Sequence, residues 1–236
     1  MVMELSLLIK VIVASISVVI ALVAGIIELR LNPESWLNRL FFLFFITTAL
    51  GFFTYAFYHL INTGDFYTTQ DIVIPMLITA QILLNLPSIF LVMTVFILEK
   101  YKKIALNYKH LGVMLVLLVI MSIGYFIPDL VPNLHYDDYT TFQVINTETA
   151  LGLQVFVNLF RLVLFFYVIF KYTKIAKKVE ESTKKRIQWF SVGVIIIIVG
   201  IVINLLGGFL GNILIEIFAL ILLDIGIFVI VKGFLI

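Results

Sequence analysis

The stretch that decides the fold is residues 187–206, IQWFSVGVIIIIVGIVINLL, which contains no charged side chain. A helix of this length, at about 1.5 Å per residue, matches the hydrocarbon thickness of a bilayer. The segment is apolar on every face and lacks the alternation of polar and apolar residues found in membrane β-strands. It therefore predicts a transmembrane α-helix.

Six further apolar runs of similar length lie along the 236-residue chain. The seven predicted spans are 11–29, 40–61, 72–98, 111–127, 150–170, 187–206 and 213–231. Between the last two spans, Gly207-Gly208 and Gly211-Asn212 predict a tight turn. Because span 11–29 exceeds the apolar part of a signal peptide and lacks an Ala-x-Ala cleavage site, we expect it to be retained. Residues 1–236 are thus predicted to form a single all-α, seven-helix transmembrane domain.

The composition excludes several classes of protein. Hydrophobic residues make up 63% of the chain and charged residues 13%, and there is no cysteine. A soluble domain requires a surface of which roughly a quarter to a third is charged. Soluble enzymes, disordered chains and nucleic-acid-binding domains are therefore excluded. Without cysteine, disulfides, thiolate nucleophiles and cysteine-ligated metals are excluded as well.

Basic residues are distributed unevenly among the connections between spans. Fourteen of the sixteen Lys and Arg residues follow the first, third, fifth and seventh spans, and none follows the second, fourth or sixth. Basic loops are retained in the cytoplasm. We therefore expect a multi-pass protein of the cell membrane with its N-terminus outside and its C-terminus in the cytoplasm.

Two connections are long. The predicted external connection, 128–149, is either a solvated loop or a lid over an external pocket. The connection 171–186 carries seven basic residues. We expect it to continue the two flanking helices beyond the lipid and to contact anionic lipids.

Signatures of catalysis and of cofactor binding are missing from the sequence. The three histidines, His59, His110 and His135, fall at different predicted depths, which argues against a bis-histidine haem and against a three-histidine metal site. Phosphate-binding glycine-rich loops and hydrolase motifs are absent. We predict a protein that is not an enzyme and that has no cofactor and no metal.

Polar side chains inside the predicted spans are costly to keep in lipid, so each requires a reason. Gln154, Asn158 and Arg161 follow one another at i, i+4 and i+7 and therefore share one face of a helix. Arg161 and Asp224 are expected at similar depth, which predicts a buried ion pair between them. Glu216 is the alternative partner for Arg161.

The polar residues within the spans have two interpretations. They form hydrogen bonds between helices that determine the packing, or they line a ligand cavity in the outer half of the bundle, partly roofed by the connection 128–149. The residues of this predicted ligand cavity are Tyr55, Tyr58, His59, Gln81, Asn85, Gln154, Asn158, Arg161, Asn204 and Glu216.

Three short motifs resemble a known family. Residues 32–39, NPESWLNR, lead into the aromatic run 40–44, LFFLF, and two basic motifs follow, KYKK at 100–103 and KKRIQ at 184–188. Together they resemble the seven-helix N-terminal membrane sensor domain of prokaryotic histidine kinases. The resemblance implies a sensor of an external or membrane-borne signal with a cytoplasmic output. Because neither a phosphoacceptor histidine nor an ATP-binding domain follows Ile236, we expect a stand-alone sensor that acts on a separate protein.

Three functions remain open at the level of the sequence. The first is a non-catalytic, receptor-like sensor, the second a small transporter or ion-translocating protein that uses Arg161, Glu216 and Asp224, and the third a structural subunit of a membrane complex. The expected partners are membrane lipids, a cytoplasmic signalling protein or a membrane complex, a small-molecule ligand and a second copy of the chain. Nucleic acid is excluded.

The distribution of basic residues generates a prediction about topology. A reporter enzyme fused after Ile236 is expected to be active only in the cytoplasm, and one inserted beside Asp137 only outside the cell, because basic connections resist translocation. Paired fusions to a reporter active outside and to one active inside measure this. An externally active fusion at Ile236 would contradict the predicted orientation.

Overall fold

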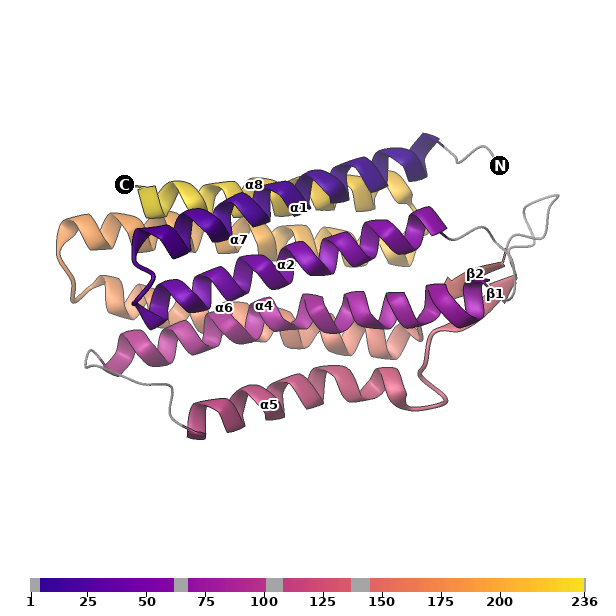
Figure 1. The fold of residues 1–236 in the computed structure, drawn as a ribbon, viewed down its shortest axis with the longest axis horizontal. Helices are drawn as coiled ribbons and strands as arrows, with labels where there is room; N and C mark the ends of the chain where they lie inside the picture. The colour runs from indigo at the N-terminus through magenta and orange to yellow at the C-terminus, as the bar shows by residue number, and fades with distance from the viewer. Residues whose placement is uncertain (1–4, 62–67, 101–107, 137–144, 236) are drawn as a thin grey trace.

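The computed structural model describes residues 5–61, 68–100, 108–136 and 145–235. Its fold is a bundle of long helices, shown in Figure 1. The helical segments are α1 (Leu5–Leu31), α2 (Trp36–Ile61), the π-helical turn η1 (Thr69–Val73), α4 (Ile74–Lys100), α5 (Tyr108–Ser122), the 3-10 turn η2 (Ile123–Phe126), α6 (Leu151–Ala176), α7 (Glu181–Leu210) and α8 (Ile213–Leu235). Among the described residues, seven helices are long and apolar enough to cross a membrane, and each overlaps one predicted span, which confirms the helical architecture.

The exposed surface of the bundle is apolar. Leu115 on α5, Val163 on α6 and Phe228 on α8 are each more than 60% exposed, and many other large apolar side chains lie open beside them. Contiguous apolar surface of this extent is rare on soluble proteins. The exposed side chains therefore fit a membrane protein, as the sequence predicts.

Six of the helices contact one another in a closed cyclic order. α1 packs on α2, α2 on α4, α4 on α6, α6 on α7, α7 on α8, and α8 returns to α1. α5 stands outside this ring, where it packs mainly on α4, and it occupies the edge of the bundle in Figure 1. This order decides which polar side chains can meet.

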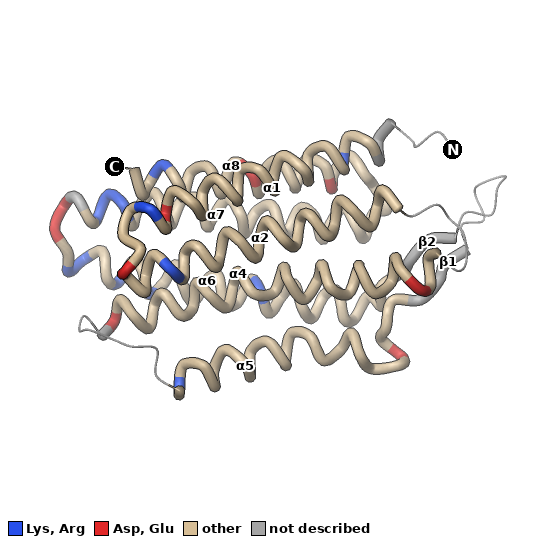
Figure 2. The backbone as a smooth tube through the Cα atoms, viewed as in Figure 1, with Lys and Arg blue, Asp and Glu red and all other residues tan. Residues whose placement is uncertain are grey.

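The two ends of the bundle differ in charge and in structure. Lys and Arg residues gather at the end that carries the α1–α2 and α6–α7 connections (Figure 2), which we name the basic end. The opposite end, the hairpin end, carries the antiparallel strands β1 (Asn133–Tyr136) and β2 (Ile145–Glu148). These two strands differ from the purely helical fold that the sequence predicts. Residues 137–144 of the predicted lid, including Asp137 and Asp138, lie outside the described residues.

The predicted turn between α7 and α8 is confirmed at Gly211-Asn212. Gly211 has a φ of 59°, a left-handed conformation that favours glycine, and the Asn212 backbone N–H donates to the Gly207 carbonyl at 2.9 Å. The Asn212 side-chain oxygen then accepts from the Leu214 N–H at 3.0 Å and caps α8. Gly207 and Gly208, in contrast, lie inside α7 rather than in the turn.

Glycines spaced seven residues apart bring α7 and α8 into backbone contact. Gly193, Gly200 and Gly207 on α7 face the antiparallel α8, whose residues Gly226 and Ala219 lie seven positions apart. A Cβ on Gly193 would lie 2.7 Å from the Gly226 carbonyl oxygen, and a Cβ on Gly226 would lie 2.9 Å from the Gly193 carbonyl oxygen. Small residues allow helices to approach this closely in lipid, where packing rather than water drives association.

This contact predicts a position-dependent response to a single methyl group. Gly193→Ala and Gly226→Ala should each destabilise the protein by about 1–3 kcal/mol, because the added Cβ overlaps a backbone oxygen on the facing helix. The control is Gly112→Ala on α5, whose Cβ would meet nothing within 4 Å. The midpoint of unfolding in a titration of mixed micelles with dodecyl sulfate measures the difference. Equal effects at all three positions would contradict the backbone contact.

Candidate functional site

Arg161 on α6 is the centre of the most extensive polar network among the described residues. Its Nε donates to Asn85 Oδ1 at 2.9 Å, one terminal nitrogen donates to Asn158 Oδ1 at 3.2 Å, and the other donates to Gln81 Oε1 at 3.1 Å and to the Gln81 carbonyl oxygen at 3.2 Å. The residue is only 8% exposed and lies near the middle of its helix. All four acceptors are neutral, so they solvate the guanidinium without neutralising its charge.

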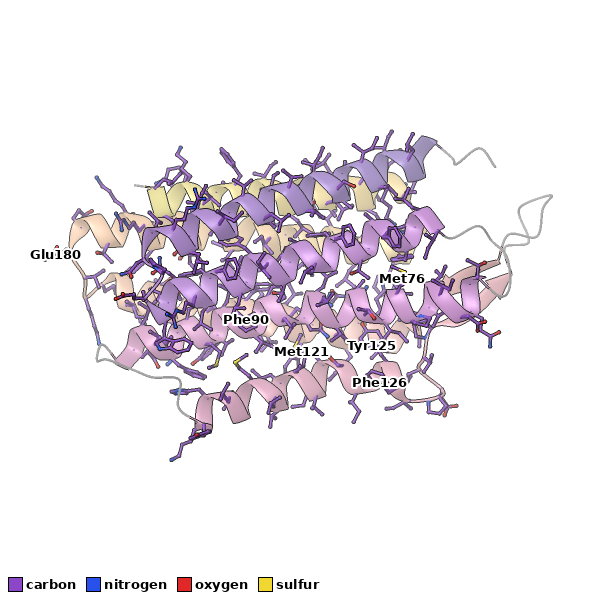
Figure 3. All side chains as sticks on the ribbon, in the orientation of Figure 1. Met76, Phe90, Met121, Tyr125, Phe126 and Glu180 are labelled. Atoms are coloured by element: carbon purple, nitrogen blue, oxygen red, sulfur yellow. The ribbon has the colours of Figure 1, made fainter. Side chains whose placement is uncertain are left out.

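Asn85 extends this network from α4 to α5. Its Nδ2 donates to the Met121 carbonyl oxygen at 3.0 Å and lies 3.4 Å from Ser122 Oγ. At Ser122 the α-helical geometry of α5 ends and the 3-10 turn η2 begins. Figure 3 shows Met121 and Tyr125 on the side of this segment that faces the bundle. A single buried asparagine therefore connects Arg161 to the point where α5 changes its helical geometry.

Lys10 on α1 is the centre of a second cluster, nearer the hairpin end. Its ammonium group forms an ion pair with Glu216 in the first turn of α8 and lies 5.4 Å from the centroid of the Tyr55 ring on α2. The rings of Tyr58 and His59 contact each other at a tilt of 31°, with their centroids 4.2 Å apart. The buried Nε2 of His59 has no hydrogen-bond partner among the described residues. This cluster joins α1, α2 and α8.

Lys10 is not among the predicted site residues, because it lies one residue before the predicted span 11–29. A lysine in that place resembles an ordinary flanking charge, whereas the observed helix α1 begins at Leu5 and includes it. Glu216, which was the alternative partner for Arg161, pairs with Lys10 instead. The signal that could have found this pair is an acidic residue in the first turn of the last span, which required a cation nearby.

The predicted ion pair between Arg161 and Asp224 is wrong. Arg161 bonds to α4 and to its own helix, whereas Asp224 on α8 lies beside Ser17 of α1. Within the described part of the chain, Asp224 Oδ1 is buried without a hydrogen-bond partner. Similar depth in two helices does not make them neighbours, and α7 separates α6 from α8 in the ring.

The remaining predicted cavity residues, Gln154, Asn158 and Asn204, lie on α6 and α7. Asn158 Nδ2 donates to the Gln154 carbonyl oxygen at 2.9 Å. The Gln154 amide nitrogen would lie 3.2 Å from a Cβ on Gly208. Asn204, half-buried on α7, has no side-chain hydrogen bond to any other residue that the structure describes. The ten residues thus divide between two clusters and α7, and a single cavity lined by all of them stays a prediction.

The motif at 32–39 forms a local turn at the basic end. Asn32 Oδ1 accepts from the Ser35 N–H at 3.2 Å, and Arg39 Nε donates to the Pro33 carbonyl at 2.8 Å. Asn38 Nδ2 donates to Glu28 Oε1 at 3.1 Å and to the Glu28 carbonyl at 3.0 Å, which ties α2 back to α1. Glu28 is buried, and the sequence analysis did not single it out.

Comparison of the chain with protein-family models gives no match, and comparison with curated proteins gives none either. Among the described residues, no group of three or more His, Asp or Glu side chains is placed to hold a metal ion. The candidate site is therefore identified from the contacts between its residues, in particular from the hydrogen bonds of Arg161.

Double-mutant cycles are expected to distinguish the observed partners of Arg161 from the rejected one. Arg161→Leu and Asn85→Leu should show a coupling free energy of about 0.5–3 kcal/mol, because the two side chains share a buried hydrogen bond. Arg161→Leu and Asp224→Leu should be additive within about 0.5 kcal/mol. Lys10→Met with Glu216→Gln provides a positive control for a bonded pair.

Unfolding of each single and double variant in mixed micelles measures these coupling energies. A stronger coupling of Arg161 to Asp224 than to Asn85 would show that the observed network is not the one that stabilises the bundle.

Proposed function

We propose that this chain is a non-catalytic, receptor-like sensor of the cell membrane that acts on a separate cytoplasmic partner. The observation that carries the proposal is the buried Arg161 guanidinium, which is bound only by neutral acceptors among the described residues. A charged side chain near the centre of a bilayer costs at least about 2.5–3.5 kcal/mol, and such residues commonly mark functional sites. An unneutralised cation retains affinity for an anionic ligand.

The position of α5 supplies the conformational step of this proposal. α5 lies outside the ring of six helices, and Asn85 bonds both to Arg161 and to the Met121 carbonyl of α5. A ligand that draws Arg161 away from Asn85 changes the bonding of Asn85 and with it the contact to α5. α5 is then the two-state element that reports ligand binding toward the basic end.

The distribution of charge supports the proposed orientation. Lys and Arg residues gather at one end of the bundle in Figure 2, and Lys174, Lys178 and Lys185 are exposed there. Glu180 lies at the tip of the α6–α7 connection at this end, as Figure 3 shows. Under the positive-inside rule this end faces the cytoplasm, and the N-terminus lies outside. The exposed lysines then suit an acidic surface on the cytoplasmic partner.

A structural subunit of a membrane complex is the second candidate. The direct bonds of the Arg161 network and the Lys10–Glu216 ion pair favour it, since a packing role requires polar groups that are bonded across helices. Transport has weaker support. Arg161 belongs to the contact between α4 and α6, whereas Glu216 and Asp224 both face α1 from α8, so the three charged residues do not line one path.

The test of the sensor measures the position of α5. Because the chain has no cysteine, nitroxide labels can be attached at Gly112→Cys on α5 and at Phe170→Cys on α6, and the distance between them can be measured by electron–electron double resonance in lipid nanodiscs. Arg161→Gln and Asn85→Leu should each change the ratio of two distance populations. Asn85→Leu removes the bond to Met121, and Arg161→Gln removes the bond that holds the Asn85 side chain in place for it.

Asp224→Asn is the control, since Asp224 belongs to another helix contact and should leave the distances unchanged. A single distance population that is the same in all variants would show that α5 has only one position. That result would overturn the sensor and favour the structural subunit.

A further inference from the structure

An apolar groove runs between α4 and α5 and opens on the lipid-facing surface. Its lining consists of Ile82 on α4 and, from α5 and η2, of Leu118, Val119, Ser122, Ile123 and Phe126. Five of these six residues are apolar. In Figure 3, Phe126 lies at the end of the α5–η2 segment, and its side chain is 66% exposed. A groove with this lining suits a hydrocarbon chain.

The one polar residue of the groove connects it to the buried cation. Ser122 Oγ lies 3.4 Å from Asn85 Nδ2, and Asn85 Oδ1 accepts from Arg161 Nε at 2.9 Å. Ile82 follows Gln81, which accepts two further bonds from Arg161. The inner side of the apolar groove is therefore one asparagine away from an arginine whose charge is not neutralised by any described residue.

The charge and depth of this site determine which amphiphile fits it. Arg161 donates four hydrogen bonds to the described residues, so one of the five N–H groups of its guanidinium has no partner among them and can bind a ligand. Arg161 also lies near the middle of α6, below the level that the phosphate groups of a bilayer occupy. A single chain with a small anionic head reaches this depth, whereas a phospholipid headgroup stays at the interface.

We propose that the groove between α4 and α5 binds a long-chain fatty acid, with its chain along Leu118 and Ile123 and its carboxylate directed toward Ser122 and Arg161. This inference rests on the proposed sensor function and names the class of its signal. Binding draws the guanidinium toward the carboxylate and competes with its bond to Asn85. The ligand thus acts on the same contact that holds α5.

Photo-crosslinking in phosphatidylcholine nanodiscs tests the site. The probe is palmitic acid with a diazirine in the part of its chain close to the carboxylate, so that the reactive group stays beside residues 118–126. The matched probe is the corresponding alcohol, which has the same chain and no charge. Cross-links of the acid are expected on residues 118–126. They should exceed those of the alcohol by about tenfold, the difference expected for a hydrogen bond between charged groups.

Two variants test separately the binding of the hydrocarbon chain and the binding of the carboxylate of the fatty acid. Val119→Trp should occlude the groove and reduce cross-linking to the level of the surrounding lipid, whereas Val163→Trp, on the exposed face of α6, is the matched control and should have no effect. Arg161→Gln should abolish the preference for the acid over the alcohol. If Arg161→Gln does not fold, the comparison of Val119→Trp with Val163→Trp still decides whether the groove is occupied.

Three results would each overturn the fatty-acid site. The first is equal labelling of the groove and of the exposed face of α6, and the second is equal labelling by the acid and the alcohol. The third is stronger labelling by a phospholipid that carries a diazirine. The distance measurement on α5 is independent of these outcomes. If the distance measurement shows two positions of α5 but the groove shows no preference for the fatty acid, the sensor proposal stands and the fatty acid is rejected as its ligand. If the fatty acid labels the groove specifically but α5 has a single position, the binding site stands and the sensor proposal is rejected.

Discussion

A buried guanidinium requires hydrogen-bond acceptors that the surrounding medium cannot supply, and this requirement organises one half of the bundle. Arg161 obtains its acceptors from Asn85 and Gln81 on α4 and from Asn158 on its own helix. Asn85 must in turn use its amide hydrogens, and it uses them on the end of α5. One charge on α6 therefore positions α4 directly and α5 indirectly, because unsatisfied polar groups are costly in an apolar interior.

The other half of the bundle is held by close approach rather than by charge. Gly193 and Gly226 bring the backbones of α7 and α8 together. Gly207 continues this contact to the hairpin end, where a Cβ would lie 2.9 Å from the Cγ of Glu216. The absence of a side chain at Gly207 thus leaves room for Glu216 beside α7, from where it reaches Lys10 on α1. Packing and electrostatics are coupled at this point, and together they close the ring of helices.

The motif at residues 32–39 has a structural explanation. Asn32 and Arg39 close a turn through the backbone, and Asn38 binds both the carboxylate and the carbonyl of Glu28. These contacts determine how α2 follows α1 at the basic end. A short motif of this kind reflects the geometry of a connection between two helices, so the proposed function depends on the Arg161 network instead.

The sequence by itself determined the seven helices, the turn at Gly211-Asn212 and some of the buried polar residues, among them Asn85, Arg161 and Asp224. Span length, turn chemistry and hydropathy are local properties of the chain. It did not determine the partners of those residues. Arg161 and Asp224 have similar depth, but only the cyclic order of the helices places Asn85 beside the one and Ser17 beside the other. Lys10 was likewise overlooked, because its role depends on Glu216, which is distant in the chain. Contacts between side chains follow from which helices are neighbours and how they are rotated, and only the tertiary structure decided both.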